Sequence, residues 1–172
     1  NKLMESIKNI VFLGMMGSGK SSIGFLVSKR LRLDFYDIDD CIEKDLGMKI
    51  SKIFKEKGEN FFRKIEEKTT LKILKKNNVI ISLGGCAFLN NNIKKIILKN
   101  HLSFWLKWNS ETLINRIKNS KKRPLAVGIT ELDLLNLIKK RSNVYSKAQY
   151  KINCNGLSKS EIVKKIIDIY EN

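Results

Sequence analysis

The sequence contains little cysteine, proline or histidine, and these shortages exclude several classes of protein. Among 172 residues there are three cysteines, one proline and one histidine. Cys41, Cys86 and Cys154 are odd in number and far apart, with no CxxC pair, so neither a disulfide framework nor a structural zinc site is expected. Repeats and low-complexity linkers are absent as well. The hydrophobic content of 42% suits one compact α/β domain that covers residues 1–172.

Long apolar runs are also missing. No stretch approaches the roughly 20 apolar residues that a helix needs to cross a bilayer. The first residues, NKLMESIKN, lack the apolar segment of a signal peptide. We therefore expect a cytoplasmic protein without a membrane partner.

Acidic residues are scarce beside basic ones. There are 17 Asp and Glu against 34 Lys and Arg, which gives a formal net charge of +17. Such an excess could serve nucleic-acid binding, because Lys and Arg neutralise phosphates. The basic residues are spread over every segment, however, and Lys, Asn and Ile are abundant together, which favours a compositional bias and a solvated basic surface. We expect affinity for anionic ligands but no nucleic-acid partner.

Short apolar runs alternate with longer segments of helical period, and this alternation predicts βαβ units on a parallel sheet. Strands are expected at Asn9–Leu13, Leu33–Tyr36, Val79–Leu83, Leu102–Trp108 and Tyr150–Ile152. Helices are expected at Ser22–Leu31, Glu59–Asn77, Asn92–Lys99, Ser110–Lys118, Glu131–Lys147 and Ser160–Tyr170. Ser158 and Glu161 have the spacing of a capping box ahead of the last helix.

A glycine-rich turn joins the first strand to the first helix. Residues 14–21, GMMGSGKS, fit the pattern G-x-x-x-x-G-K-[ST] in the strand–turn–helix context that the pattern requires. The glycines let several backbone N–H groups face one phosphate, and the helix adds the positive end of its dipole. Lys20 would reach the β- and γ-phosphates, and the Ser21 hydroxyl would hold Mg²⁺. Such a turn can exist without a ligand, but its context predicts a site for a nucleoside triphosphate.

Three aspartates follow the second strand in FYDIDD. Asp37 and Asp39 are two residues apart, so on an extended backbone their side chains leave in different directions. One could face Mg²⁺, and the other an acceptor hydroxyl that needs a base. Helix capping is the alternative for both and is the expected role of Asp40. The neighbouring phosphate loop favours a functional role for Asp37 and Asp39.

Two arginines are candidates for binding an anion. Arg63 lies between Glu59 and Glu66 at helical spacing, which fits either a surface ion-pair lattice or a ligand site. Arg141 shares the apolar stripe of its helix, where it either snorkels to solvent or meets an anionic partner. Two guanidiniums that converge on one pocket would suit a substrate with a carboxylate.

Two further turns attract attention. SLGG places Gly84 and Gly85 at the end of the third strand, at the edge where open α/β sheets bind ligands, although a tight turn into the next helix explains them equally well. The only proline, Pro124, lies in a polar and basic stretch between two helices, which is the best candidate for a mobile loop.

With these motifs in hand, the sequence strongly resembles the shikimate kinases, small kinases of the nucleoside monophosphate kinase-like P-loop class, over essentially its whole length. The resemblance rests on six motifs that occur in the family's order and at matching spacings. They are the P-loop, the D-x-D of FYDID, the GExxFRxxE string from Gly58 to Glu66, the SLGG turn, the Arg-Pro-Leu at Arg123, and Arg141 with Tyr145.

The resemblance implies a three-layer α/β/α P-loop kinase fold with a five-stranded parallel sheet of order 2-3-1-4-5. It also implies acceptor-binding helices at about residues 38–77 and a mobile lid at about residues 118–130. ATP, with Mg²⁺, would donate its γ-phosphoryl group to the 3-hydroxyl of shikimate in the pathway to chorismate and the aromatic amino acids. We expect a monomer.

The resemblance assigns site residues by position. The donor ATP would be held by Gly14, Gly17, Ser18, Gly19, Lys20, Ser21, Ser22, Arg116 and Arg123, with Arg116 stacking on adenine. Mg²⁺ would be held by Ser21 and Asp37. Shikimate would contact Asp39, Phe54, Phe62, Arg63, Gly84, Gly85, Cys86 and Arg141, and the two arginines would grip its carboxylate. The catalytic residues would be Lys20, Asp39 as the base, and Arg123 from the lid.

Three positions depart from the family pattern. Cys86 stands where the family usually has a third glycine, so its side chain could crowd the acceptor pocket. NGLSKS offers Ser158 or Lys159 where the family has a proline that helps to sandwich adenine. The segment SKAQY after Tyr145 also differs from the commoner pattern.

Two alternatives come from different classes of protein. One is another small-molecule P-loop kinase, of the gluconate or nucleotide kinase type, and the other is a basic nucleic-acid-binding module. The pairing of Arg63 and Arg141 with Asp39 suits a compact hydroxy acid better than a nucleobase, which favours the shikimate kinase interpretation. A degraded P-loop protein that acts only as a partner is disfavoured because the chain keeps Lys20, Asp39 and Arg123.

Overall fold

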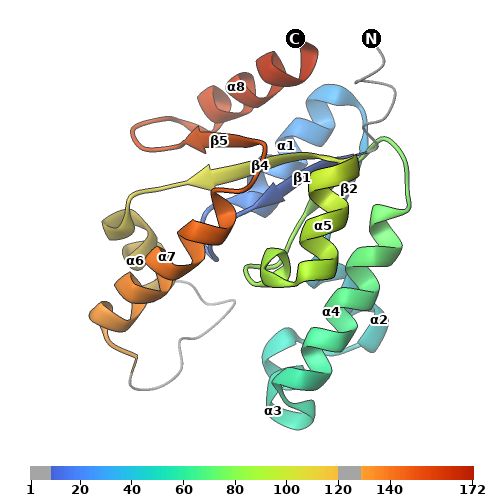
Figure 1. The fold of residues 1–172 in the computed structure, drawn as a ribbon, viewed down its shortest axis with the longest axis vertical. Helices are drawn as coiled ribbons and strands as arrows, with labels where there is room; N and C mark the ends of the chain where they lie inside the picture. Colours follow the sequence, from blue (N-terminus) through green and yellow to red (C-terminus); the bar gives the residue numbers. More distant parts are fainter. Residues whose placement is uncertain (1–8, 120–128) are drawn as a thin grey trace.

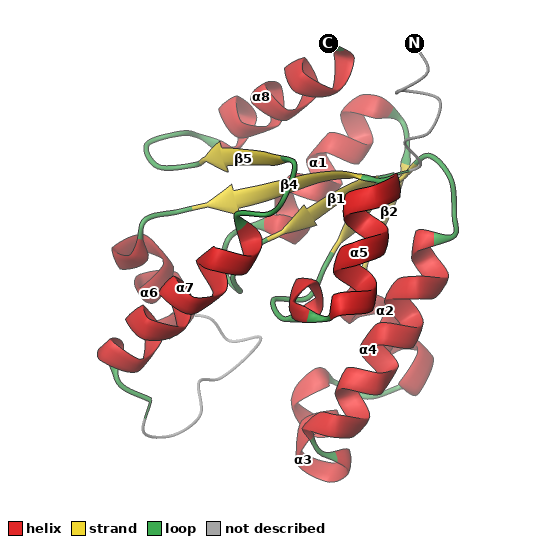
Figure 2. Ribbon diagram, viewed as in Figure 1, coloured by secondary structure: helices red, strands yellow, loops and turns green. Residues whose placement is uncertain are grey.

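The fold is a parallel sheet between two layers of helices, as the computed structural model shows (Figures 1 and 2). The structure describes residues 9–119 and 129–172. Its five strands form one sheet in the order β2-β3-β1-β4-β5, with every pair parallel. The strands are β1 (Ile10–Leu13), β2 (Asp34–Asp37), β3 (Val79–Ser82), β4 (Leu102–Lys107) and β5 (Tyr150–Asn153). The predicted class and strand order are confirmed, and each strand end lies within one residue of its predicted position.

All six expected helices are present, and two short ones join them between β2 and α4. The helices are α1 (Lys20–Leu31), α2 (Ile38–Leu46), α3 (Ile50–Lys57), α4 (Glu59–Leu74), α5 (Asn91–Asn100), α6 (Ser110–Lys118), α7 (Glu131–Tyr145) and α8 (Lys159–Glu171), with a 3₁₀ turn, η1, at Ala87–Leu89. The capping box at Ser158 and Glu161 is confirmed, and Thr130 with Asp133 forms a second one at the start of α7. No helix of the described residues is both long and apolar enough to cross a membrane.

The two faces of the sheet have separate hydrophobic cores. Along β1, Val11 and Leu13 belong to one core, while Ile10 and Phe12 belong to the other. Side chains that alternate between two buried faces explain why this strand reads as a continuous apolar run. Helices α1 and α8 cover the face of Ile10 and Phe12, and α2, α4, α5, α6 and α7 contribute to the core on the face of Val11 and Leu13 (Figure 1).

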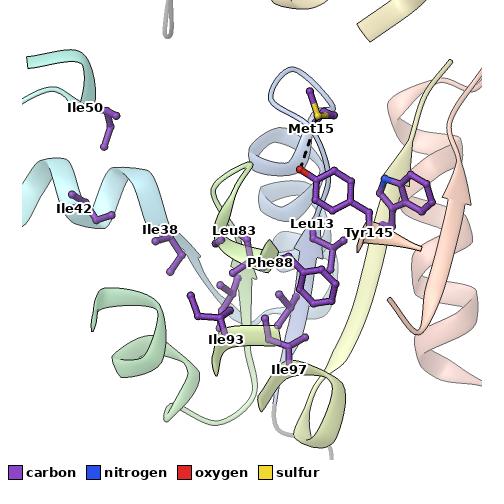
Figure 3. Close-up of a cluster of buried hydrophobic side chains, with 14 of the residues drawn as sticks. Leu13, Met15, Ile38, Ile42, Ile50, Leu83, Phe88, Ile93, Ile97 and Tyr145 are labelled. Atoms are coloured by element: carbon purple, nitrogen blue, oxygen red, sulfur yellow. Dashed lines mark hydrogen bonds between the residues drawn. The ribbon is translucent and has the colours of Figure 1, made fainter. Parts of the chain in front are cut away.

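The core on the face of Val11 and Leu13 continues to the carboxyl ends of the strands. Figure 3 shows Leu13 and Leu83 beside Phe88, and Ile93 and Ile97 of α5 beneath them. All five side chains are at most 2% exposed. This core therefore fixes the loops that follow β1 and β3, and these loops carry the glycine-rich turns.

Asn9 is a buried polar residue that connects three elements. It is 2% exposed, and its Nδ2 donates to the carbonyl oxygens of Leu74, the last residue of α4, at 3.3 Å and of Lys76 at 2.8 Å. Its Oδ1 accepts from the Val79 N–H at 2.9 Å, at the start of β3. One side chain thus replaces the missing hydrogen bonds of a helix end and of a strand start.

We predict that Asn9→Leu lowers the free energy of unfolding by about 3 kcal/mol, because each buried backbone group that loses its partner costs roughly 1–3 kcal/mol. Urea unfolding followed by circular dichroism would measure this. The control is Asn92→Ala, since Asn92 is exposed and its side-chain amide donates to the carboxylate of Glu67, and it should change the stability by less than about 0.5 kcal/mol. Equal effects in the two variants would contradict the structural role of Asn9.

Candidate active site

The phosphate loop lies between β1 and α1, where the sequence predicts it. Gly17 and Gly19 have φ angles of 78° and 88°, in the left-handed region that glycine adopts without strain. The Lys20 side chain folds back over the loop, and its Nζ donates to the carbonyl oxygens of Gly14 at 2.8 Å and Met15 at 3.0 Å. The loop therefore curls around its own lysine, which places one positive charge at the start of α1.

A cavity of about 610 Å³ opens in front of this loop, and we call it the donor cavity. It brings together most of the residues predicted for nucleotide and metal, and it is lined by Gly17, Gly19, Lys20, Ser21, Ser22 and Asp37. Asp39, the predicted base, lines the same cavity. Of the remaining predicted loop residues, Ser18 is buried in the loop, and Gly14 accepts the bond from Lys20. Arg123 and most of the predicted lid lie outside the described residues.

The aspartates are arranged differently from the prediction. Asp37 is the last residue of β2 and the N-cap of α2, and its Oδ1 accepts from the Asp40 N–H at 3.1 Å. The capping role that was expected of Asp40 therefore belongs to Asp37. Asp39 lies in the first turn of α2, so the expectation of an extended backbone from Asp37 to Asp39 is wrong. The reason is that an N-cap residue keeps extended angles while the residues after it are already helical.

Asp37 also meets the phosphate loop. The Ser21 hydroxyl donates to Asp37 Oδ2, so a hydroxyl and a carboxylate lie side by side on the wall of the donor cavity. Oxygen ligands of this kind are what Mg²⁺ prefers, and a protein usually supplies only one or two of them while phosphates and water supply the rest. Ser21 and Asp37 therefore fit the predicted metal site.

The turn after β3 supplies residues to two cavities: Gly84 and Gly85 line the donor cavity, and Cys86 lines a second one. A Cβ atom on Gly84 would lie 2.8 Å from Glu66 Oε2 and 3.1 Å from Asp39 Oδ1, so a side chain there would displace a carboxylate. A Cβ atom on Gly85 would lie 3.7 Å from Arg141 Nη1. The chain turns tightly here, with the Ala87 N–H bonded to the Gly84 carbonyl, as one interpretation of SLGG expects. Gly84 and Gly85 also line the donor cavity, and their contact with a ligand stays a prediction.

A second cavity of about 460 Å³ lies on the other side of this turn, and we call it the acceptor cavity. Arg63, Arg141 and Cys86 all line it. Arg63 makes the predicted ion pairs, at 3.0 Å to Glu66 and 3.5 Å to Glu59, and its side chain is 31% exposed. Burial lowers the pKa of Arg63, but the nearby Cys86 and Glu66 outweigh this effect and raise the pKa above its usual value. Arg63 is thus both an ion-pair member and a charged cavity residue.

Arg141 reaches the cavity from α7, and Tyr145 lies one helical turn further on. The Tyr145 hydroxyl donates to the Gly85 carbonyl and lies 4.0 Å from the sulfur of Met15 (Figure 3). Arg141 Nη1 lies 3.8 Å from the same sulfur. Burial raises the pKa of Tyr145 well above its usual value, so the hydroxyl keeps the proton that it donates. Met15, for which the sequence indicated no function, thus joins the phosphate loop to the acceptor side.

The predicted aromatic residues Phe54 and Phe62 lie behind Arg63. Their ring centroids are 4.6 Å apart, and the Arg63 guanidinium lies 5.8 Å and 5.3 Å from the two rings. Phe62 is fully buried, and neither ring lines the donor cavity or the acceptor cavity. They support the arginine that was expected to lie beside them in the pocket.

Arg116 lies at the rim of the phosphate loop. Its Nη1 donates to the Gly17 carbonyl at 3.1 Å, and its guanidinium stacks on the ring of Trp108 at 3.9 Å. Trp108 also contacts the loop, through an indole N–H that donates to the Ser18 carbonyl at 2.7 Å. The sequence indicated Arg116 but not Trp108, which was expected only as the last residue of the strand Leu102–Trp108.

One cavity faces a phosphate loop, the adjoining cavity presents two arginines, and a glycine turn without side chains separates them. This is the arrangement of a P-loop small-molecule kinase, in which a nucleotide and an anionic acceptor meet end to end.

Comparison with known proteins specifies the family. The family model for shikimate kinase matches residues 16–171, and the chain belongs to the shikimate kinase family. A shikimate kinase from Thermodesulfovibrio yellowstonii is 40% identical over 166 residues, which cover 96% of each chain.

Solved structures agree with this assignment. Shikimate kinase from Acinetobacter baumannii in complex with shikimate is 27% identical, covers 98% of this chain and 96% of its own, and has a TM-score of 0.88. Shikimate kinase from Aquifex aeolicus is 34% identical, with coverages of 95% and 96% and a TM-score of 0.85. A gluconokinase from Sinorhizobium meliloti, at 14% identity and a TM-score of 0.54, shares the fold alone.

Cys86 allows a test of the acceptor cavity. Because the cavity stays open with the thiol in place, Cys86→Gly should change the KM for the acceptor by less than about threefold, as expected when a small group is removed from an open site. Cys86→Leu should raise the KM by about tenfold or more, because the larger side chain takes up space in the cavity that Arg63 and Arg141 line. Steady-state kinetics would measure both. An unchanged KM in Cys86→Leu would show that residue 86 does not face the acceptor.

Proposed function

We propose that this protein is a shikimate kinase that transfers the γ-phosphoryl group of ATP to the 3-hydroxyl of shikimate, giving shikimate 3-phosphate and ADP. The observation that carries the proposal is the position of Arg63 and Arg141. They come from α4 and α7, far apart in the sequence, and line one cavity together with Cys86, which directly follows the donor-cavity residues Gly84 and Gly85.

On the donor side, the loop amides and Lys20 would hold the β- and γ-phosphates, and Ser21 and Asp37 would hold Mg²⁺. When bound, Mg²⁺ would neutralise charge on the phosphates. Phosphoryl transfer has a loose and highly charged transition state, so positioning and positive charge supply most of the catalysis. Lys20 would contribute directly, because its Nζ already lies over the loop.

On the acceptor side, the two guanidiniums would bind the carboxylate of shikimate and fix the orientation of its ring. Gly84 leaves room for the ring to approach both loops, because no Cβ fills the space before Asp39 and Glu66. Asp39 would accept a hydrogen bond from the reacting hydroxyl and take its proton as the bond to phosphorus forms. Its place on the wall of the donor cavity gives it access to that hydroxyl.

Arg123 is proposed to reach the transferring phosphates from the lid at about residues 118–130. A lid that closes over the site would also exclude water, which competes with the hydroxyl as acceptor.

The experiment that tests the reaction measures ADP release from ATP and Mg²⁺ with different acceptors. Shikimate should support turnover, whereas gluconate and nucleoside monophosphates should support less than about a hundredth of it, because a site built for one set of polar groups rejects ligands that leave them unpaired. Turnover with gluconate equal to that with shikimate would contradict the proposal. Omitting Mg²⁺ should abolish the reaction with shikimate.

The arginine pair makes a second prediction. Arg63→Ala and Arg141→Ala should each raise the KM for shikimate by about tenfold to a hundredfold, because each leaves the carboxylate without one charged partner. The KM for ATP should change by less than about threefold, since neither arginine lines the donor cavity. The control is Lys64→Ala, which removes an exposed charge next to Arg63 on α4. Wild-type KM values in both arginine variants would refute the carboxylate site.

A further inference from the structure

Trp108, directly after β4, connects the phosphate loop to Arg116. Its indole N–H donates to the Ser18 carbonyl at 2.7 Å, and Ser18 is itself only 1% exposed. The guanidinium carbon of Arg116 lies 3.9 Å from the centroid of the indole ring. The other cation–ring contacts found among the described residues lie between 5.1 and 6.0 Å, so this one is the closest stack of the group.

Arg116 is an exposed residue, yet its guanidinium is held at two places. One face lies on Trp108, and Nη1 donates to the Gly17 carbonyl at 3.1 Å. The same nitrogen lies 3.9 Å from the place of a Cβ atom on Gly19, at the start of α1. An arginine on the surface normally samples many rotamers, and fixing one costs entropy. Here the plane is already oriented at the rim of the phosphate loop.

We propose that Trp108 is a positioning residue for the donor nucleotide. The indole is the first layer of a three-layer stack, the Arg116 guanidinium is the second, and the nucleotide base is the third. This inference rests on the proposed function, which supplies the nucleotide. A guanidinium has two flat faces, and aromatic rings stack favourably on each of them.

The hydrogen bond from Trp108 to the Ser18 carbonyl links the stack to the phosphate loop. The phosphates of the donor are held by the loop, and the base has to lie at a fixed distance from them. Trp108 bonds to the phosphate loop, and the Arg116 guanidinium lies on its ring. Trp108 therefore orients the plane on which the base stacks, relative to the loop that holds the phosphates, before the nucleotide binds. Such preorganisation saves ordering entropy when the nucleotide binds.

A different role would leave a different signature. If Trp108 only stiffened the phosphate loop, its removal would weaken the binding of every ligand that has phosphates. If Trp108 orients Arg116 for a base, its removal weakens the binding of only those ligands that contain a base. Mg²⁺ with ADP and Mg²⁺ with inorganic tripolyphosphate separate the two cases, and titration calorimetry measures both without an acceptor.

We expect Trp108→Leu to lower the affinity for ADP by about tenfold and the affinity for tripolyphosphate by less than about twofold. The loss for ADP is on the scale that stacking of one base provides. Trp108→Phe keeps a flat ring and should recover most of the lost ADP affinity. The matched control is Tyr36→Leu, which also removes a ring under a cation, the 5.1 Å contact with Lys76, at a residue that lines neither cavity. It should leave both affinities unchanged.

If Trp108→Leu lowered the affinities for both ligands equally, or changed neither affinity, the proposed role of Trp108 would be overturned. Failure of the wild-type protein to bind ADP would instead refute the proposed function. Should Trp108→Leu fail to fold, fluorescence keeps the inference testable: in Trp105→Phe, where Trp108 is the one tryptophan left, ADP should change the emission and tripolyphosphate should not. Identical responses to both ligands would overturn the stack by this second route.

Discussion

The arrangement of the site depends on Gly84, where there is no room for a side chain. At Gly84, the carboxylates of Glu66 and Asp39 come within about one atomic diameter of where a Cβ would stand. This close approach brings α2, α4 and the end of β3 to one point, and the next residue, Gly85, brings in Arg141. The donor and acceptor cavities are therefore neighbours because the backbone between them is bare. A parallel sheet makes this geometry available, since all its strands end at the same edge.

The two sides of the site are also joined by buried side chains. Met15 belongs to the phosphate loop, yet its sulfur contacts Arg141 and Tyr145 of α7. Tyr145 in turn holds the Gly85 carbonyl. A shift of the phosphate loop on nucleotide binding would thus move the contacts that Met15 makes with α7, the helix that contains Arg141.

Much of this was predictable from the sequence, and the exceptions have physical reasons. The strands were predictable because β1 and β3 are buried on both faces, so each is a compact apolar run. The direction of Asp39 was not, because it depends on α2 beginning at Ile38, and a helix of nine residues carries a weak periodic signal. Trp108 was missed for a different reason: an aromatic residue that continues an apolar strand looks like core, and only the fold brings it to the loop 90 residues earlier in the chain.

The 3₁₀ turn η1 has a wider consequence. It follows Cys86 and packs against both α4 and α7, the helices that supply the two arginines, while Phe88 anchors it in the interior at 1% exposure. The width of the acceptor cavity therefore depends on Ala87 and Phe88, which are buried and do not line the cavity, as well as on Leu89, which does. Evolutionary drift at such interior positions would retune substrate discrimination while every residue in contact with the ligand stayed the same.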